Sequence, residues 1–233
     1  MIKEKKFEIY LSIENDKFKI FLFETKDLKN VYTNQLTVNN TLNINFDELK
    51  KFLDNNIFKI ERLIGAFIED IYLILNYNKE LQTDISIKKK NSNNLTNQKD
   101  LNHALVELKK LFNENKKDQK IIHMLIKNFI IDEKNHNFFV ENIPSEFLNL
   151  HVKFITLPDE VIIKFNKVLQ KYQVQIKKFI SSKYLKKFSP NKEIEISLMA
   201  HKLIDGYNLN EIEIVPKIEE NKGFFEKFFQ LFS

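Results

Sequence analysis

The chain has 233 residues, 43% of them hydrophobic, which is enough for one large or two small domains with a real core. It contains no cysteine, which excludes disulfides, thiolate metal sites and a cysteine nucleophile. The net charge of +5 does not indicate nucleic-acid binding, because Arg62 is the only arginine and the lysines are mixed with acidic residues. The sequence shows no signal peptide or membrane-spanning run, so we expect a cytoplasmic protein.

The first part of the chain is expected to form three strands. Apolar and polar residues alternate from Phe7 to Glu14 and again in Lys17–Thr25. The turn Asn15-Asp16 lies between these segments, so the two strands are predicted to form a hairpin. Val31–Val38 is predicted to be the third strand.

A helix and an interior strand are expected next. Asn45, with Glu48 at the third helical position, has the pattern of a capping box. The apolar residues behind it keep a helical spacing as far as Ile64, which predicts one continuous helix. After Gly65, the apolar run 70–76 is typical of a strand that is buried on both faces.

Residues 81–157 have the order strand, helix, strand, strand, which predicts a small compact unit inserted into a larger one. The first strand leads into a Lys/Asn-rich loop, 88–97, whose lysines are expected to be solvated, with contact to anionic lipid as the alternative. A helix capped by Asn97 follows, then a long apolar strand, 119–132, and an alternating strand, 150–156. The helix is expected to bury Leu101, Ala104, Leu105, Leu108, Leu111 and Phe112.

The segments after this unit are expected to return the chain to the larger one. A helix that begins at Pro158 is followed by a strand, 174–180, and a short helix, 182–188. The turn residues Ser189-Pro190-Asn191 mark a boundary. Beyond it we expect one more helix and a possible strand at 212–215.

The last residues, 222–233, predict an amphipathic helix that is too short to span a bilayer but long enough to lie in the headgroup layer. A charged connector, 217–223, precedes it and favours a surface membrane anchor. The alternatives are a helix that docks on the protein's own core and a helix that binds a partner protein. The predicted membrane-binding residues are Phe224, Phe225, Phe228, Phe229, Leu231 and Phe232, with Lys222 and Lys227 beside them.

This order of elements resembles the FtsA family of bacterial actin-like cell-division proteins. Asp70–Tyr77 is similar to a strand of the family's subdomain 1A, and Phe179–Tyr184 is similar to the return strand and helix of that subdomain. Residues 81–157 resemble the inserted subdomain 1C. The segment Gly223-Phe224-Phe225 is similar in kind to the family's C-terminal membrane-targeting helix.

The resemblance implies an α+β (α/β) fold with four parts. A partial actin-like, ribonuclease-H-like 1A subdomain comprises residues 1–80 and 158–188. An inserted strand-helix-strand-strand, 1C-like subdomain comprises 81–157. An unassigned segment and linker, 189–221, then precedes the amphipathic helix at 222–233.

The chain departs from the family at the phosphate-binding hairpin. There the family carries Asp-x-Gly-Thr, whose glycine lets the backbone approach ATP phosphates and whose aspartate faces the metal. This chain has Ser12-Ile13-Glu14-Asn15, which replaces the glycine by a negative charge. No second phosphate loop is recognisable, and the three glycines lie elsewhere. The departures imply a reduced form that binds no nucleotide and needs no cofactor.

No other chemical site is predicted. The paired acidic residues lie at helix starts or in linkers, and no serine has a nucleophile-elbow pattern. The histidines lack metal-ligand spacing, so we predict no catalytic, cofactor-binding or metal residues and no enzyme activity. These histidines are His103, His123, His136, His151 and His201.

The resemblance implies a non-catalytic, peripheral membrane adaptor of the cell-division machinery at the inner face of the cell membrane. It would tether or scaffold a divisome or cytoskeletal partner such as FtsZ or another FtsA-like subunit. Self-association is expected, because a single short tail is a marginal anchor and two tails on one assembly bind more firmly. The alternative is a soluble interaction module of another envelope assembly, similar to the pilus-assembly protein PilM.

Overall fold

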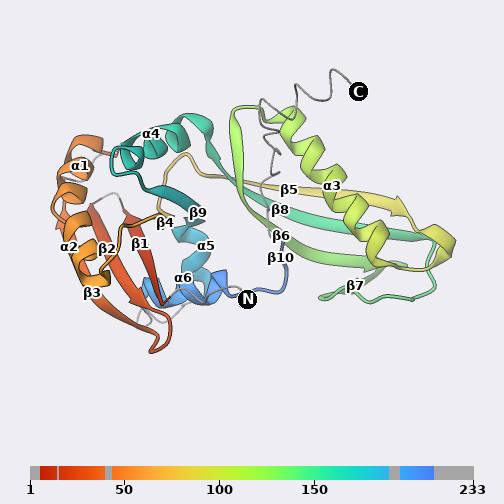
Figure 1. The fold of residues 1–233 in the computed structure, drawn as a ribbon. Helices are drawn as coiled ribbons and strands as arrows, with labels where there is room; N and C mark the ends of the chain where they lie inside the picture. Colours follow the sequence, from red (N-terminus) through yellow and green to blue (C-terminus); the bar gives the residue numbers. More distant parts are fainter. Residues whose placement is uncertain (1–5, 15, 40–43, 189–194, 213–233) are drawn as a thin grey trace, which may run out of the picture.

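The computed structural model describes residues 6–14, 16–39, 44–188 and 195–212, and it contains two sheets joined side by side (Figure 1). The mixed α/β fold with two sheets that the sequence predicts is confirmed. The first sheet consists of β1 (Phe7–Ile13), β2 (Lys17–Glu24), β3 (Lys29–Thr37), β4 (Asp70–Leu75) and β9 (Gln175–Ser181). The second consists of β5 (Leu81–Lys90), β6 (Gln119–Ile131), β7 (Lys134–His136), β8 (Phe147–Pro158) and β10 (Glu211–Ile212).

The first sheet has the strand order β3-β2-β1-β4-β9 and helices on both faces. β1, β2 and β3 are antiparallel, as the predicted hairpin requires, whereas β1, β4 and β9 run parallel. One face packs against α1 (Phe46–Asp54), α2 (Ile57–Ile64) and α4 (Asp159–Gln170); the other packs against α5 (Ser182–Leu185) and α6 (Ile196–Ile204). Because both faces are covered, β4 is a nearly continuous apolar run.

The helix predicted from Asn45 to Ile64 is wrong in one respect, because two helices, α1 and α2, occupy this segment. Asn45 caps α1 as predicted, and its side-chain oxygen accepts from the backbone of Asp47 and of Glu48, each at 3.2 Å. The break falls at Asn55-Asn56. Asparagine side chains compete with the helical backbone for hydrogen bonds.

Asn56 shows that competition directly, because its fully buried amide serves three other groups. Its Nδ2 donates to the carbonyl of Phe52 at 2.5 Å. Its Oδ1 accepts from the Tyr32 hydroxyl at 2.7 Å and from Asn34 Nδ2 at 2.8 Å. The side chain thus ties the helix break to β3.

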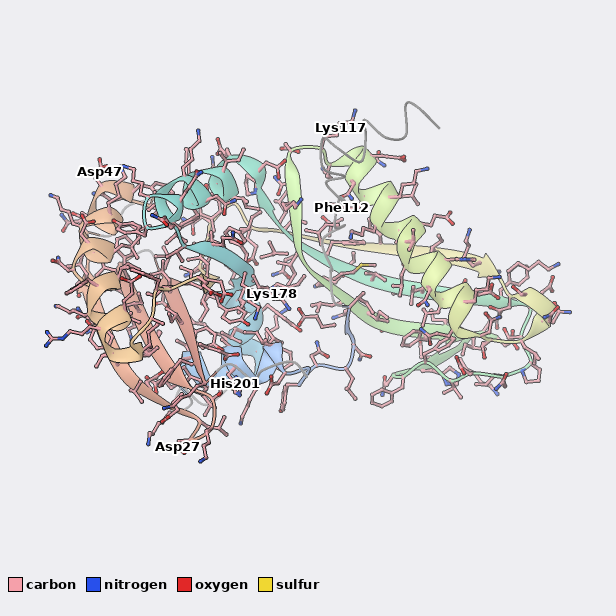
Figure 2. The ribbon with its side chains drawn as sticks, viewed as in Figure 1. Asp27, Asp47, Phe112, Lys117, Lys178 and His201 are labelled. Atoms are coloured by element: carbon pink, nitrogen blue, oxygen red, sulfur yellow. The ribbon has the colours of Figure 1, made fainter. Side chains whose placement is uncertain are left out.

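The second sheet is antiparallel throughout, in the order β10-β6-β8-β5 with β7 on the edge of β6. α3 (Gln98–Asn115) covers one face and is capped by Asn97, whose side chain accepts from the Asp100 amide at 2.9 Å. Phe112 of α3 stacks on Phe154 of β8, with ring centroids 4.9 Å apart (Figure 2). On the opposite face, the outer part of β8 carries the half-buried polar side chains Asn149, His151 and Lys153.

Three details of this region differ from the sequence-based expectation. Leu111 is 41% exposed because it lies roughly 80° around the helix from the buried stripe. β5 extends to Lys90 and is followed by a short 3-10 turn (Ser92–Asn94), so the expected loop is shorter. The chain reverses at Asp132 and Glu133, both in the left-handed conformation, and forms β7 in the segment between the two predicted strands 119–132 and 150–156.

The structure contains two separate clusters of buried apolar residues. The larger belongs to the first sheet and its helices, and the smaller lies between α3 and the second sheet. Strands β6 and β8 contribute to both, because Ile122, Leu125, Ile155 and Leu157 pack into the larger cluster. The boundaries proposed for the 81–157 unit stay a prediction, but parts of its strands β6 and β8 lie in the core of the first sheet.

Candidate functional site at the junction of the two sheets

The predicted membrane-binding residues lie outside the described part of the chain. This applies to all of Lys222, Phe224, Phe225, Lys227, Phe228, Phe229, Leu231 and Phe232. The membrane site therefore stays a prediction from the sequence, and the structure directs attention to polar residues elsewhere.

Residues 195–212, which were predicted to contain a helix but were assigned to no subdomain, connect the two sheets. α6 packs on the first sheet through Met199, Ala200 and Leu203. The chain then crosses to the second sheet, where β10 pairs with β6 and the Asn210 carbonyl accepts from the Ile126 amide at 2.8 Å. This crossing brings a carboxylate, Glu211, between the sheets.

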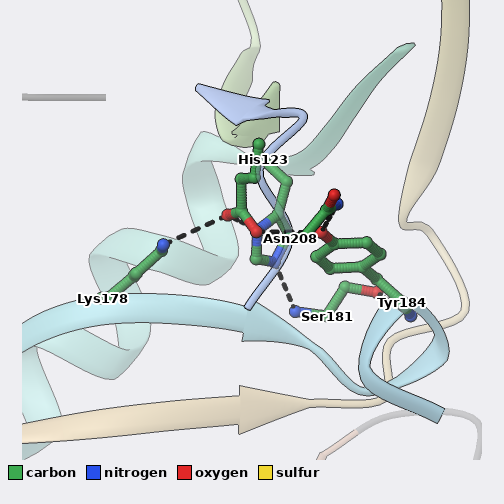
Figure 3. A network of polar contacts seen from close by, with 6 residues as sticks. His123, Lys178, Ser181, Tyr184 and Asn208 are labelled. Carbon is green, nitrogen blue, oxygen red and sulfur yellow. Dashed lines mark hydrogen bonds and ion pairs between the residues drawn. The ribbon is translucent and has the colours of Figure 1, made fainter. Parts of the chain in front are cut away.

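Glu211 is the centre of a polar cluster that joins four elements (Figure 3). Its Oε1 accepts from His123 Nδ1 of β6 at 2.8 Å and from Lys178 Nζ of β9 at 3.1 Å. Its Oε2 accepts from the Tyr184 hydroxyl of α5 at 2.9 Å, and Asn208 Nδ2 donates to the same hydroxyl at 2.6 Å. We call His123, Lys178, Ser181, Tyr184, Asn208 and Glu211 the junction cluster.

The protonation state of His123 follows from its two partners. The imidazole is fully buried, and its Nε2 accepts from the backbone N–H of Ser181 at 3.0 Å. Nε2 therefore carries no proton, and Nδ1 donates its proton to Glu211. Burial lowers the pKa of His123, in agreement with a neutral ring in the folded protein.

Glu211 is held as a carboxylate. Burial acts to raise the pKa of Glu211, but the hydrogen bond from His123, the charge of Lys178 and the hydrogen bond from Tyr184 together lower it. Burial also raises the pKa of the Tyr184 phenol, so this group stays a neutral donor. The cluster therefore combines a neutral histidine, an anionic glutamate and a lysine, whose polar groups contact one another.

This geometry holds elements together. The acceptor nitrogen of His123 is occupied by a backbone N–H and not by a hydroxyl that could act as a nucleophile. The side-chain hydroxyl of Ser181 instead accepts from the Tyr184 amide at 3.1 Å and caps α5. Cutting either contact of the His123 ring would leave a polar atom of a fully buried imidazole without its partner.

A second polar cluster attaches α6 to the first sheet. His201 Nδ1 lies 2.8 Å from Glu8 Oε2, and its Nε2 lies 3.4 Å from a carboxylate oxygen of Asp205. Tyr10, which is fully buried, donates its hydroxyl to Glu8. Burial, followed by the hydrogen bond to Glu8, raises the pKa of the Tyr10 phenol. Both ends of the segment 195–212 are thus held by a histidine–glutamate pair, His201–Glu8 at one end and His123–Glu211 at the other.

The residues at the phosphate-hairpin position are engaged within the protein. Ser12 is buried in β1, and the Glu14 amide donates to the Lys17 carbonyl at 2.9 Å to close the turn. The Glu14 carboxylate lies 3.1 Å from Lys186 Nζ and 3.5 Å from Lys17 Nζ. Burial acts to raise the pKa of Glu14, but the two lysines lower it on balance. Asn15 lies outside the described residues.

The junction cluster was not predicted from the sequence because its members are far apart in the chain. His123 and Glu211 are separated by 88 positions. The available signal was a single histidine inside the apolar run 121–126, where a buried polar residue needs a partner. The five histidines do not come together, and the part of the chain that the structure describes has no group of three or more His, Cys, Asp or Glu residues that could hold a metal.

None of the helices that the structure describes is both long enough and apolar enough to cross a bilayer.

Comparison with known proteins gives likeness in fold only. No protein family and no curated protein matches the sequence. Among solved structures, the chain is similar to a PilM–PilN type IV pilus biogenesis complex, with a TM-score of 0.49 and 9% identity, over 78% of this chain and 49% of that chain. It is also similar to the cytoplasmic domain of EpsL, an inner-membrane component of the type II secretion system of Vibrio cholerae, with a TM-score of 0.36 and 9% identity. That match covers 75% of this chain and 56% of that chain.

A third similar structure is a Bacteroides thetaiotaomicron protein with an actin-like ATPase fold and unknown function. Its TM-score is 0.32 at 14% identity, over 81% of this chain and 59% of that chain. This chain spans between 49% and 59% of the length of the three structures. At these identities and TM-scores, no binding property of those proteins transfers to this chain.

Proposed function

We propose that this chain is a non-catalytic scaffold of a bacterial envelope assembly, which positions a protein partner and turns over no substrate. The observation that carries the proposal is that Glu14 is ion-paired within the protein. Glu14 stands in the hairpin at the position of the glycine that lets an actin-like ATPase bind phosphate, and its carboxylate is paired with Lys17 and Lys186. Phosphate would have to displace this carboxylate, and Ser12 offers no carboxylate to a metal ion.

The junction cluster supports a scaffold role because it fixes one sheet relative to the other. An ATPase of this kind is expected to move its parts around the nucleotide, whereas here the contacts of Ser181 with His123 and of Lys178 and Tyr184 with Glu211 would have to break for the sheets to separate. A rigid pair of sheets suits a protein that holds partners at a set distance.

Isothermal titration of the full chain with ATP and magnesium tests the proposal. We expect no binding up to millimolar ATP. A matched Glu14→Gly variant removes the carboxylate and leaves Lys17 and Lys186. ATP binding by this variant would show that the carboxylate alone excludes phosphate, and no binding would show that the rest of the phosphate site is missing as well. Micromolar ATP affinity of the unmodified chain would contradict the proposal.

The sequence resemblance favours the division machinery as the assembly, with FtsZ or another FtsA-like subunit as the partner. The pilus-assembly reading is the second candidate, because the hairpin departs from the FtsA pattern at both Ser12 and Glu14. Gene neighbourhood separates the two: division and cell-wall genes beside this gene favour the first reading, and pilus or secretion genes favour the second.

The proposal places the scaffold in the cytoplasm, on the inner face of the cell membrane, through the predicted anchor at 222–233. Co-sedimentation with vesicles containing anionic lipid tests this part. We expect the full chain to pellet and a Phe225→Glu/Phe228→Glu variant to stay in solution, because the two charges oppose insertion. A double variant that still pellets would show that another surface binds the membrane.

A further inference from the structure

β3 forms the outer edge of the first sheet, and among the described residues it pairs only with β2 (Figure 1). None of its residues is buried, and Val31 and Leu36 are 43% and 36% exposed. Residues 30–38 contain no charge, no proline and no glycine. An open strand edge with this composition is a ready template for another strand.

The other edges of the two sheets are protected in recognised ways. β9 carries Lys177 and Lys178 and has a bulge opposite β4. β5 carries Asp84 and three consecutive lysines, 88–90. Within the described residues, β10 is two residues long and β7 is three. Charges, bulges and short strands all oppose edge-to-edge pairing, so β3 is the exception among the described strand edges.

We propose that β3 pairs antiparallel with the β3 of a second copy of this chain, across a two-fold axis that joins the two first sheets into one continuous sheet. The pairing would hold whatever the function of the assembly, so it does not depend on the scaffold role. It also assigns a surface to the self-association that was expected because a single tail is a marginal membrane anchor.

Charge is the reason to prefer a second copy as the occupant. The whole chain is 30% charged, yet two copies aligned about the midpoint of residues 30–38 place no charged residue opposite another. Lys29 of one copy then lies beside Asn39 of the other, beyond the uncharged stretch. Asp27, which lies in the turn before β3 (Figure 2), forms an ion pair with Lys29 at 2.8 Å, and both residues precede the uncharged stretch.

The same alignment gives the exposed side chains suitable neighbours. Asn34 is the midpoint, so Thr33 of one copy lies opposite Gln35 of the other, and Leu36 lies opposite Tyr32. In the single chain the Gln35 amide is bonded to Asn34 Oδ1 at 2.8 Å, and this local contact would be exchanged for a carbonyl of the partner strand. A single strand pair is a small interface, so we expect a weak dimer that forms at micromolar or higher concentration.

Sedimentation equilibrium of the full chain, from micromolar to several hundred micromolar, tests the proposal. We expect the mass to rise toward that of two chains. A Thr33→Lys/Gln35→Lys variant should raise the dimer dissociation constant about tenfold or more, because like charges then face each other. Both positions are exposed, so the substitutions leave the core unchanged.

A charge-swap experiment adds an arm that loss of folding cannot imitate. The Thr33→Glu/Gln35→Glu variant alone should be as weak as the lysine variant, but an equimolar mixture of the two should form a dimer at least as tight as the unmodified chain. This holds for any register that keeps residues 33–35 in contact. Gln82→Lys/Ser86→Lys, at exposed positions of edge strand β5, is the matched control and should leave the dissociation constant unchanged.

Three results would overturn the proposal. The unmodified chain could stay monomeric throughout the concentration range. The lysine variant could dimerise as tightly as the unmodified chain, which would place the contact elsewhere. The β5 control could weaken the dimer as much as the β3 variant, which would make the effect one of general charge.

Discussion

The first sheet has helices on both faces, whereas the second sheet is covered on one face by α3 alone. The difference is visible in single strands. β4 is buried along almost its whole length, while β8 alternates between buried and half-buried residues from Phe147 to Lys153. A strand buried on both faces can use apolar residues throughout, and a strand with one face in water must alternate. Among the described residues, the first sheet is therefore covered on both faces, while the second sheet leaves the face opposite α3 partly open in the region of Phe147–Lys153.

The open face of the second sheet is occupied by contacts between its own strands. Lys153 lies 3.6 Å from Asp84, and Lys88 lies over the ring of Phe147 at 4.4 Å. These exposed pairs keep the face polar and contribute little to stability. The stability of the second sheet must then come from its core under α3 and from its attachment to the first sheet.

The largest expected effect comes from removing a ring from either core. Phe154→Ala in the second core and Phe165→Ala in the first should each lower the free energy of unfolding by about 3–5 kcal/mol, because both rings are fully buried. Since Ile122 and Leu157 tie the second sheet into the first core, we expect one unfolding transition for both variants. Denaturant unfolding followed by circular dichroism measures this.

Phe58→Ala is the control for these two variants, because this ring on α2 is 71% exposed and should change stability by less than about 0.5 kcal/mol. A second, separate transition in Phe154→Ala would show that the two sheets unfold independently, and the comparison above would then describe two domains.

Cutting the junction cluster is the next largest effect. Glu211→Ala leaves the buried Nδ1–H of His123 and the Tyr184 hydroxyl without their acceptor, and should cost about 2–4 kcal/mol. Glu211→Gln keeps an acceptor but loses the charge that pairs with Lys178, so its stability should lie between those of the unmodified chain and Glu211→Ala. Hydrogen exchange should show faster opening of β6 beside β10. If Glu211→Ala unfolds at the same denaturant concentration as the unmodified chain, the cluster does not couple the sheets.

The sequence predicts much of both sheets because the patterns that define them are local. The hairpin of β1 and β2, the order β5, α3, β6, β8 and the caps Asn45 and Asn97 depend on residues within a few positions of each other. The break between α1 and α2 falls at Asn56, whose side chain also binds Tyr32 of β3, 24 positions away, and no local period of apolar residues reports it. The junction cluster is harder still, because His123 and Glu211 each look unremarkable until the fold brings them together.

Acid should weaken the attachment of the two sheets. The pKa of His123 lies below its ordinary 6.5 in the folded protein, because burial disfavours the charged ring. As the pH falls below 6.5, His123 takes up a proton in the unfolded chain but stays neutral in the folded chain. Stability should then fall by about 1.4 kcal/mol per pH unit from this group, until the pH reaches the folded pKa. Glu211, whose pKa is also lowered in the folded protein, adds a loss in the same direction below its ordinary 4.5.

His123→Asn tests this linkage, because asparagine can still donate to Glu211 but does not titrate. The variant should be less stable at pH 7, and its stability should change less between pH 6.5 and 5 than that of the unmodified chain. His103→Asn, at an exposed position of α3, is the matched control and should keep the original slope. Equal slopes in all three proteins would contradict a buried neutral His123.

The smallest expected effect compares one helix cap from each sheet. Asn45 accepts two long bonds of 3.2 Å from Asp47 and Glu48 at the start of α1. Asn97 accepts from the Asp100 amide at 2.9 Å and also donates to the Asp100 carboxylate at 2.7 Å. That carboxylate in turn accepts from the backbone and hydroxyl of Ser92, so Asn97 closes a small network at the start of α3.

We therefore expect Asn97→Ala to cost about 1–2 kcal/mol and Asn45→Ala about 0.5–1 kcal/mol. Asn97→Asp and Asn45→Asp keep the acceptor oxygen and serve as matched controls; the first places two carboxylates close together, so its recovery should be the less complete of the two. If the sheets unfold as one unit, both alanine variants lower the same transition, while hydrogen exchange of the Asp100 amide speeds up only in Asn97→Ala. A larger loss in Asn45→Ala would show that the network around Asp100 adds nothing to the cap, and the second sheet would then owe its stability to its core and its junction alone.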